Sequence, residues 1–203
     1  MSRSWFLISS IAVLAASTPA LSHAAPVSAK LSAVLTAFLP DAGVKTRGLP
    51  WTTGNKLPVK WAPVSPVAAD SYFRKEGFTL SRTGTAFVTV GEEPAEEVTL
   101  QLYGNSVGLQ QVGVNFNYAG EPDMNSFDRS LTVDKIVLEP LKCSRKTELA
   151  SEGNVIYVFK APGKVAAALW ESWNCPGSSG CTVGFTILYR RAALAKIDCY
   201  GGN

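Results

Sequence analysis

The chain has 203 residues, 46% of them hydrophobic, and 19 basic against 16 acidic residues give it a formal net charge of +3. This near balance excludes a typical nucleic-acid binder, which needs a strongly basic face to displace counterions from phosphates. The length fits one domain with its own hydrophobic core.

The beginning of the chain has the composition of a cleavable signal peptide. Arg3 supplies one positive charge, and an uncharged, largely apolar stretch follows it. Serine, threonine and proline dilute this stretch, so it is too polar for a membrane-spanning helix. Small residues at its end predict cleavage between Ala24 and Ala25. We therefore expect a signal peptide over residues 1–24, a single globular domain over residues 25–203, and no membrane span in the mature protein.

The next two segments predict a helix and an irregular stretch. Apolar residues recur with a helical period over residues 26–39, and a proline follows directly. This pattern predicts one N-terminal amphipathic helix. Residues 48–66 hold four prolines together with Trp51 and Trp61, so they predict an extended segment on the surface of a core. We expect these tryptophans to cover the core rather than to form a ligand platform.

Alternating strands dominate the middle of the chain. Apolar residues are concentrated over residues 78–90, and apolar and polar residues alternate over 98–103 and again over 112–118. Turn residues separate these runs, which predicts antiparallel hairpins with one buried face and one polar face. The apolar residues over 125–138 follow neither the helical period nor the strand alternation cleanly, so this segment is predicted as either a helix or a strand.

The last third predicts a second set of strands. Residues 155–159 alternate, a Pro-Gly turn follows, and residues 165–173 can return as a strand or form a short helix. Three consecutive alanines favour the helix, whereas the tight turn favours the hairpin, which we prefer. Residues 182–189 and 195–200 are then expected to be the last two strands. The fold class predicted is α+β, with one N-terminal helix and a predominantly antiparallel, disulfide-bonded β body.

All four cysteines lie in the last third of the chain. An even number of cysteines in an exported protein indicates disulfide bonds. Cys175 and Cys181 bracket a flexible run of proline, glycine and serine that can close a small ring, so we favour pairing them and pairing Cys143 with Cys199. A bridge from Cys181 to Cys199 across a terminal hairpin is the competing pairing. A zinc site is disfavoured, because the spacings contain no CxxC unit and an oxidising compartment favours disulfides.

The histidine content restricts catalytic chemistry. His23 is the one histidine of the chain, and it lies in the predicted signal peptide. The mature protein is therefore expected to lack a Ser/His/Asp or Cys/His system and any histidine-ligated metal. A hydrolase would need two carboxylates, or a lysine base with a serine. The candidate carboxylates are Glu92, Glu93, Glu96, Glu97, Asp123, Asp128 and Asp134, of which we expect the glutamates to be solvated loop residues.

These observations predict an exported, periplasmic, non-catalytic binding protein of the inhibitor or immunity type, with a protein partner in the cell envelope and no metal or cofactor. The absence of an Asn-x-Ser/Thr acceptor from the mature chain favours bacterial export. We expect Trp170, Trp173, Asn174, Ser178 and Ser179 to form a disulfide-stiffened binding tip, because rigid aromatic anchors lose little entropy on binding. Core packing is the competing interpretation of the two tryptophans. The alternative function is a carboxylate-dependent hydrolase acting on an envelope glycan.

Overall fold

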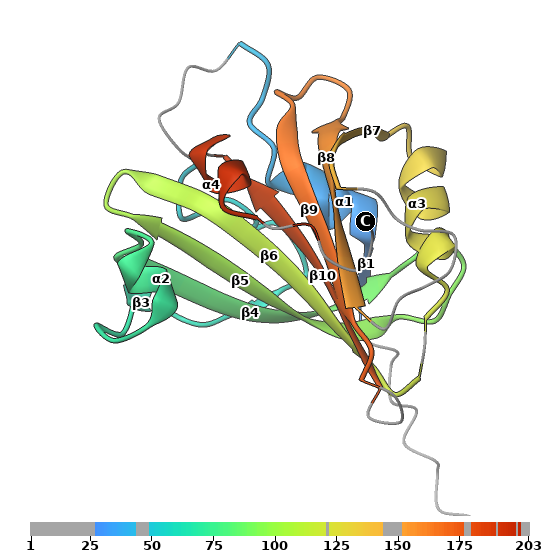
Figure 1. The fold of residues 1–203 in the computed structure, drawn as a ribbon, viewed down its shortest axis with the longest axis horizontal. Coiled ribbons are helices and arrows are strands. Elements are labelled where there is room, and N and C mark those ends of the chain that lie inside the picture. The colour runs from blue at the N-terminus through green and yellow to red at the C-terminus, as the bar shows by residue number, and fades with distance from the viewer. Residues whose placement is uncertain are drawn as a thin grey trace, which may run out of the picture.

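The computed structural model describes residues 27–43, 49–120, 122–143, 152–176, 180–189, 191–197 and 199. This part of the chain forms a strongly twisted β-sheet with short helices (Figure 1). The helices are α1 (Leu31–Ala37), α2 (Tyr72–Lys75), α3 (Met124–Val133) and α4 (Arg191–Ala195). The strands are β1 (Ser28–Lys30), β2 (Lys60–Trp61), β3 (Ser65–Pro66), β4 (Leu80–Thr89), β5 (Glu96–Asn105), β6 (Gly108–Tyr118), β7 (Val137–Lys142), β8 (Glu152–Lys160), β9 (Ala167–Asn174) and β10 (Cys181–Leu188). Within these ranges no helix is long and apolar enough to cross a membrane.

The sheet combines two antiparallel meanders. Its main strand order is β1-β4-β5-β6-β10-β9-β8-β7, and β2 and β3 also pair with β4. Among the described strands, only β1 and β4 pair in parallel. The pairing of β6 with β10 joins the meander β4 to β6 to the meander β8 to β10. Since β1, β2 and β3 cover successive parts of one edge of β4, that edge is closed to another chain.

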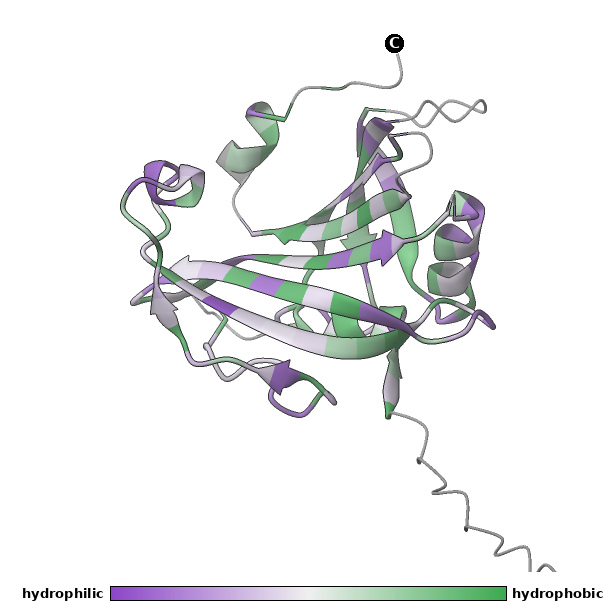
Figure 2. Ribbon diagram, turned by 90° about the horizontal axis from the view of Figure 1, so that it is seen from below, coloured by the Kyte–Doolittle hydropathy of each residue, from purple (hydrophilic) through white to green (hydrophobic). Residues whose placement is uncertain are grey.

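Alternation along the strands gives the sheet two different faces (Figure 2). One face packs against α1 and α3 and forms the core, in which the largest fully buried side chains are phenylalanines. The rings of Phe116 on β6 and Phe127 on α3 meet edge to face at 5.5 Å, and Phe127 lies 5.1 Å from Phe185 on β10. The opposite face carries the polar residues of the same strands.

The predicted N-terminal helix is only partly confirmed. The helix α1 covers residues 31–37, but residues 28–30 form β1 beside β4. The free edge of β4 offers these residues hydrogen-bond partners, and this tertiary pairing overrides the helical period. Residues 125–138 divide between helix α3 and the start of strand β7, and the side chain of Asp123 begins α3 by accepting a hydrogen bond from the backbone N–H of Asn125 at 2.9 Å.

The hairpin of β8 and β9 is confirmed, whereas the predicted strand over residues 195–200 is wrong. Helix α4 ends within that range, and Lys196, Ile197 and Cys199 belong to no strand. Two physical reasons account for this difference. Both edges of β10 are already paired, with β6 and with β9, so no edge is left for a returning strand. The alanines and leucine after Arg191 are also strong helix formers.

The proline-rich segment lies on the surface of the core, as expected, but it is extended only in part, since residues 51–58 form turns and bends. It contributes the two-residue strands β2 and β3, and both of its tryptophans pack against the core. Trp61 meets Phe38 edge to face at 6.5 Å and carries the guanidinium of Arg82 at 4.8 Å from its ring centre. The Nε1–H of Trp51 donates to the carbonyl of Asn105 at 3.1 Å. These tryptophans therefore cover the core.

Candidate functional site

A groove of about 570 Å³ lies on the face of the sheet opposite the core, between α2 and α4. Strands β5, β6, β10 and β9 form its floor, and α2 and α4 stand on either side of it (Figure 1). The floor residues are mainly amides and hydroxyls: Gln101, Gln111, Asn115, Ser172 and Thr186, together with Gly113.

The strand register places these floor residues in transverse rows. Gly113 lies between Gln101 on β5 and Thr186 on β10, and Thr186 faces Trp170 on β9. Gly113 lines the groove but is itself buried between its neighbours. A Cβ added there would meet Asn115 Nδ2 and Thr186 Oγ1 at 3.7 Å, which is an ordinary van der Waals distance. A Cβ at position 113 would therefore fit without forcing the strands apart, and the two further methyl groups of a valine would narrow the groove at its floor.

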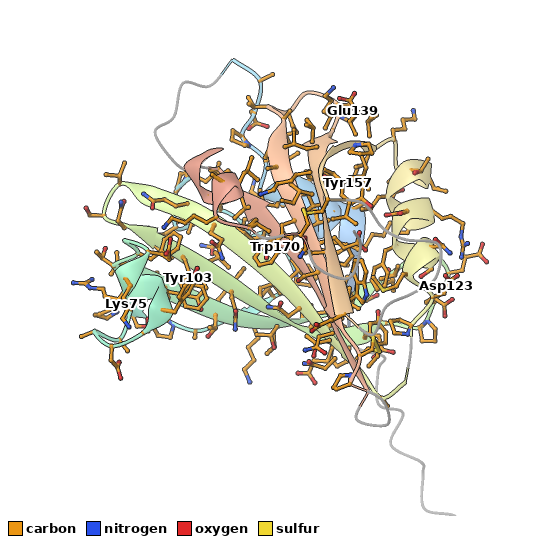
Figure 3. All side chains as sticks on the ribbon, in the orientation of Figure 1. Lys75, Tyr103, Asp123, Glu139, Tyr157 and Trp170 are labelled. Carbon is orange, nitrogen blue, oxygen red and sulfur yellow. A yellow bond between two sulfur atoms is a disulfide. The ribbon has the colours of Figure 1, made fainter. Side chains whose placement is uncertain are left out.

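Aromatic side chains from α2 and β5 form one wall. The ring of Phe73 stacks on Tyr103, with centroids 3.8 Å apart and planes at 11°. Tyr72 meets Phe73 edge to face at 5.7 Å and is 66% exposed. Figure 3 shows Tyr103 beside α2 and Trp170 near the middle of the sheet. Burial raises the pKa of the Tyr103 phenol, so this group stays neutral at ordinary pH.

The opposite wall, α4 and the residues after it, is held by three contacts. The ammonium of Lys142 donates to the carbonyls of Leu194 at 3.3 Å and Ile197 at 2.5 Å, at the end of the helix where carbonyls lack intrahelical partners. The disulfide from Cys199 to the end of β7 anchors the chain just beyond. Lys196 Nζ donates to Glu76 Oε2 at 2.5 Å, and this hydrogen bond raises the pKa of Lys196.

The ion pair of Glu76 and Lys196 has two consequences for the groove. It joins the residue after α2 to the residue after α4, and so connects the two walls. Among the described residues that line the groove, these two carry the only charged side chains. Because their charges cancel, the described lining of the groove has no net charge.

The two tryptophans of the predicted tip lie on opposite faces of the sheet. Trp170 lines the groove, whereas Trp173 is 4% exposed and packs on the core face over Gly153. Residues three apart on a strand point to opposite faces, so the two tryptophans cannot form one anchor. Asn174 is exposed at the end of β9. Ser178 and Ser179 lie outside the described residues.

The cysteines are arranged in two disulfides. Cys143 bonds to Cys199 with a Cα–Cα distance of 5.3 Å, and Cys175 bonds to Cys181 with a Cα–Cα distance of 4.1 Å. This is the pairing that the sequence favours. The competing bridge between Cys181 and Cys199 depends on a terminal hairpin, and α4 takes the place of its second strand.

None of the candidate carboxylates lines the groove. The Ser32 hydroxyl donates to Asp134, which also pairs with Lys30 at 3.2 Å, and these contacts hold the pKa of Asp134 below its usual value. Asp123 bonds Arg129 at 2.6 Å, which likewise lowers its pKa. The four glutamates Glu92, Glu93, Glu96 and Glu97 are exposed in the β4–β5 turn and at the start of β5, and Asp128 lies on α3. The described residues contain no cluster of three potential ligands that could hold a metal ion.

Sequence reasoning missed most of the groove. The polar positions of β5 and β6 are visible as the outward face of alternating strands, but their alignment with β10 depends on a pairing between distant segments. The helix α2 has only four residues, too few for a periodic signal. Glu171, which is fully buried on the core face of β9, was also not singled out.

Comparison with protein-family models, with curated proteins and with solved structures found no match for this chain. Its function therefore has to be argued from the groove and the chemistry of its lining.

Proposed function

We propose that this protein is an exported, non-catalytic binding protein that holds its ligand in the groove between α2 and α4. The observation that carries the proposal is the convergence of aromatic side chains, mainly from α2, β5 and β9, with amides and hydroxyls from β5, β6, β9 and β10. The groove volume of about 570 Å³ lies within the ~300 to 1,000 Å³ of typical small-molecule sites. Sites of this kind combine apolar surface with a few convergent polar groups.

Trp170 contributes part of its ring to this lining. Its Nε1–H is buried and has no hydrogen-bond acceptor in the part of the chain that the structure describes. Because this nitrogen is closed to solvent, a ligand in the groove would reach it only if the indole turned. The support that Trp170 gives to the proposal is therefore the apolar surface of its ring.

The proposed location rests on the N-terminal signal pattern and on the disulfides. Two disulfides with no free cysteine among the described residues are compatible with an oxidising compartment. A periplasmic location, as expected from the sequence, is part of the proposal.

The groove favours binding over the alternative hydrolase. Glycoside hydrolysis needs two carboxyl groups about 5 to 10 Å apart on either side of the bond that breaks. Among the described lining residues Glu76 is the one carboxylate, and it is paired with Lys196. A second acid at the right distance is not part of this lining.

A second candidate is the inhibitor or immunity role, with a protein partner bound at the end of the β9–β10 hairpin. The observation in its favour is the small ring closed by Cys175 and Cys181, with the exposed Asn174 directly before it. Since Trp173 is in the core and Trp170 is in the groove, this end lacks the expected aromatic anchors. We therefore rank the groove above the tip as the binding site.

One experiment separates these two sites. The mature protein, Gly113→Val and Asn174→Ala are immobilised, exposed to periplasmic extract, and the retained small molecules and proteins are identified by mass spectrometry. The groove proposal predicts that Gly113→Val loses the retained ligand and that Asn174→Ala keeps it. The reverse pattern would assign binding to the hairpin tip. Gly120→Val is the matched control, because a Cβ at this exposed glycine meets nothing within 4 Å.

A further inference from the structure

The charge of the groove indicates what kind of ligand it selects. Glu76 and Lys196 neutralise each other at 2.5 Å, and burial keeps the Tyr103 phenol protonated. A charged ligand would therefore leave water without finding an unpaired opposite charge in the lining that the structure describes, which is unfavourable. The lining favours a neutral ligand.

The floor indicates that this ligand is rich in groups that both donate and accept hydrogen bonds. The amides of Gln101, Gln111 and Asn115 and the hydroxyls of Ser172 and Thr186 each offer a donor and an acceptor. A purely apolar ligand, such as a fatty acyl chain, would cover these groups without replacing their water. Each group left unsatisfied would weaken binding by about fivefold or more. Hydroxyl groups match such a floor because they too are both donors and acceptors.

The aromatic side chains indicate that the ligand also has flat apolar faces. Tyr72, Phe73 and Tyr103 lie at the α2 wall, and Trp170 lies across the floor on β9. The face of an aromatic ring is electron-rich and attracts polarised C–H groups. Sugar rings have C–H groups on their faces and hydroxyls around their rims, so they combine the two features that the groove would bind.

We propose that the groove binds a short neutral saccharide. This inference rests on the proposed function, because it names the ligand class of the same groove. Stacking on the aromatic side chains would hold the ring faces, and the side chains of Gln101 and Thr186, on either side of Gly113, would bond the rim hydroxyls.

Isothermal titration calorimetry of the mature, disulfide-bonded protein tests this proposal. The probes are the neutral trisaccharides chitotriose, cellotriose and maltotriose, the charged trigalacturonic acid, and a neutral tripeptide with blocked ends. At least one neutral trisaccharide should bind, and trigalacturonic acid should not. Thr186→Val removes a hydroxyl without changing the side-chain volume and should weaken binding by about fivefold, the value of one neutral hydrogen bond. Thr182→Val is its matched control, because Thr182 lies on the same strand outside the groove.

Failure of the saccharide proposal can be distinguished from failure of the groove as a binding site. Absence of binding by all three neutral trisaccharides, or equal weakening by Thr186→Val and Thr182→Val, overturns the saccharide proposal. A third outcome is that the blocked tripeptide binds, that no saccharide binds, and that Gly113→Val abolishes the tripeptide binding. This outcome would overturn the saccharide as the ligand and keep the groove as the binding site. The proposed function itself fails if Gly113→Val retains the same ligands from periplasmic extract as the unaltered protein.

Discussion

Replacing Cys143 and Cys199 together by serine should destabilise the protein strongly. The bridge joins residues 56 positions apart, and the chain-entropy relation gives a stabilisation of about 4 kcal/mol for a loop of this length. The bridge between Cys175 and Cys181 spans 6 positions and gives about 2 kcal/mol by the same relation. For a domain of this size these values correspond to losses in Tm of roughly 8 to 16 °C and 4 to 8 °C.

Differential scanning calorimetry of the two double variants checks this difference. The structure adds a second expectation, because the Cys143–Cys199 bridge also anchors the α4 wall of the groove. Its loss should weaken ligand binding at temperatures where the variant is still folded, whereas loss of the Cys175–Cys181 bridge should leave binding unchanged. Equal Tm losses in the two variants would refute the entropic reasoning. A binding defect confined to the Cys175/Cys181 variant would instead support the hairpin tip.

Three further predictions concern the rest of the chain. Ser32→Ala should cost about 1 to 2 kcal/mol at pH 7 in urea unfolding, because it removes a hydrogen bond to the Asp134 carboxylate. This bond lowers the pKa of Asp134 in the folded state. The difference in unfolding free energy between the two proteins should therefore be complete above the unfolded pKa of about 4, and it should disappear as the pH falls through the lower folded pKa. The same difference at about pH 2.5 as at pH 7 would contradict this reasoning. Gly153→Ala should lower the free energy of unfolding by about 1 to 3 kcal/mol, because the new Cβ would lie 2.3 Å from Cζ2 of Trp173. Thermal unfolding of this variant at the same temperature as the unaltered protein would show that the Trp173 ring does not lie against Gly153. Mass spectrometry of the exported protein should find its N-terminus at Ala25, and an intact leader would argue against export by cleavage.

The parts of the fold that the sequence predicts are those determined by neighbouring residues. Alternation over β5 and β6 and the turns between consecutive strands specify hairpins locally, so these hairpins are predicted correctly. The glycine- and serine-rich run between Cys175 and Cys181 likewise makes a local bridge predictable. These features need no knowledge of the rest of the structure.

The parts that the sequence does not predict depend on distant segments. The residues of β1 become a strand because the edge of β4 is open to them, and residues 195–200 cannot be one because β10 is already paired on both sides. The groove depends on the same long-range pairing, since β6 and β10 bring Gly113 beside Thr186. Of the predicted tip residues that the structure describes, only Trp170 lines it, because Trp173 points to the opposite face and Asn174 lies at the end of β9.

The indole N–H signals of the protein give the most direct test of the groove as the binding site. The chain has five tryptophans, so Trp→Phe variants can assign each indole resonance in a ¹H–¹⁵N spectrum. On addition of the ligand retained from periplasmic extract, the Trp170 indole signal should shift, because the ligand would pack against its ring, and Gly113→Val should abolish the shift. The Trp51 signal should stay in place, because its N–H is already bonded to the carbonyl of Asn105. Bound ligand that leaves the Trp170 signal unmoved and shifts the amide of Asn174 would contradict the account.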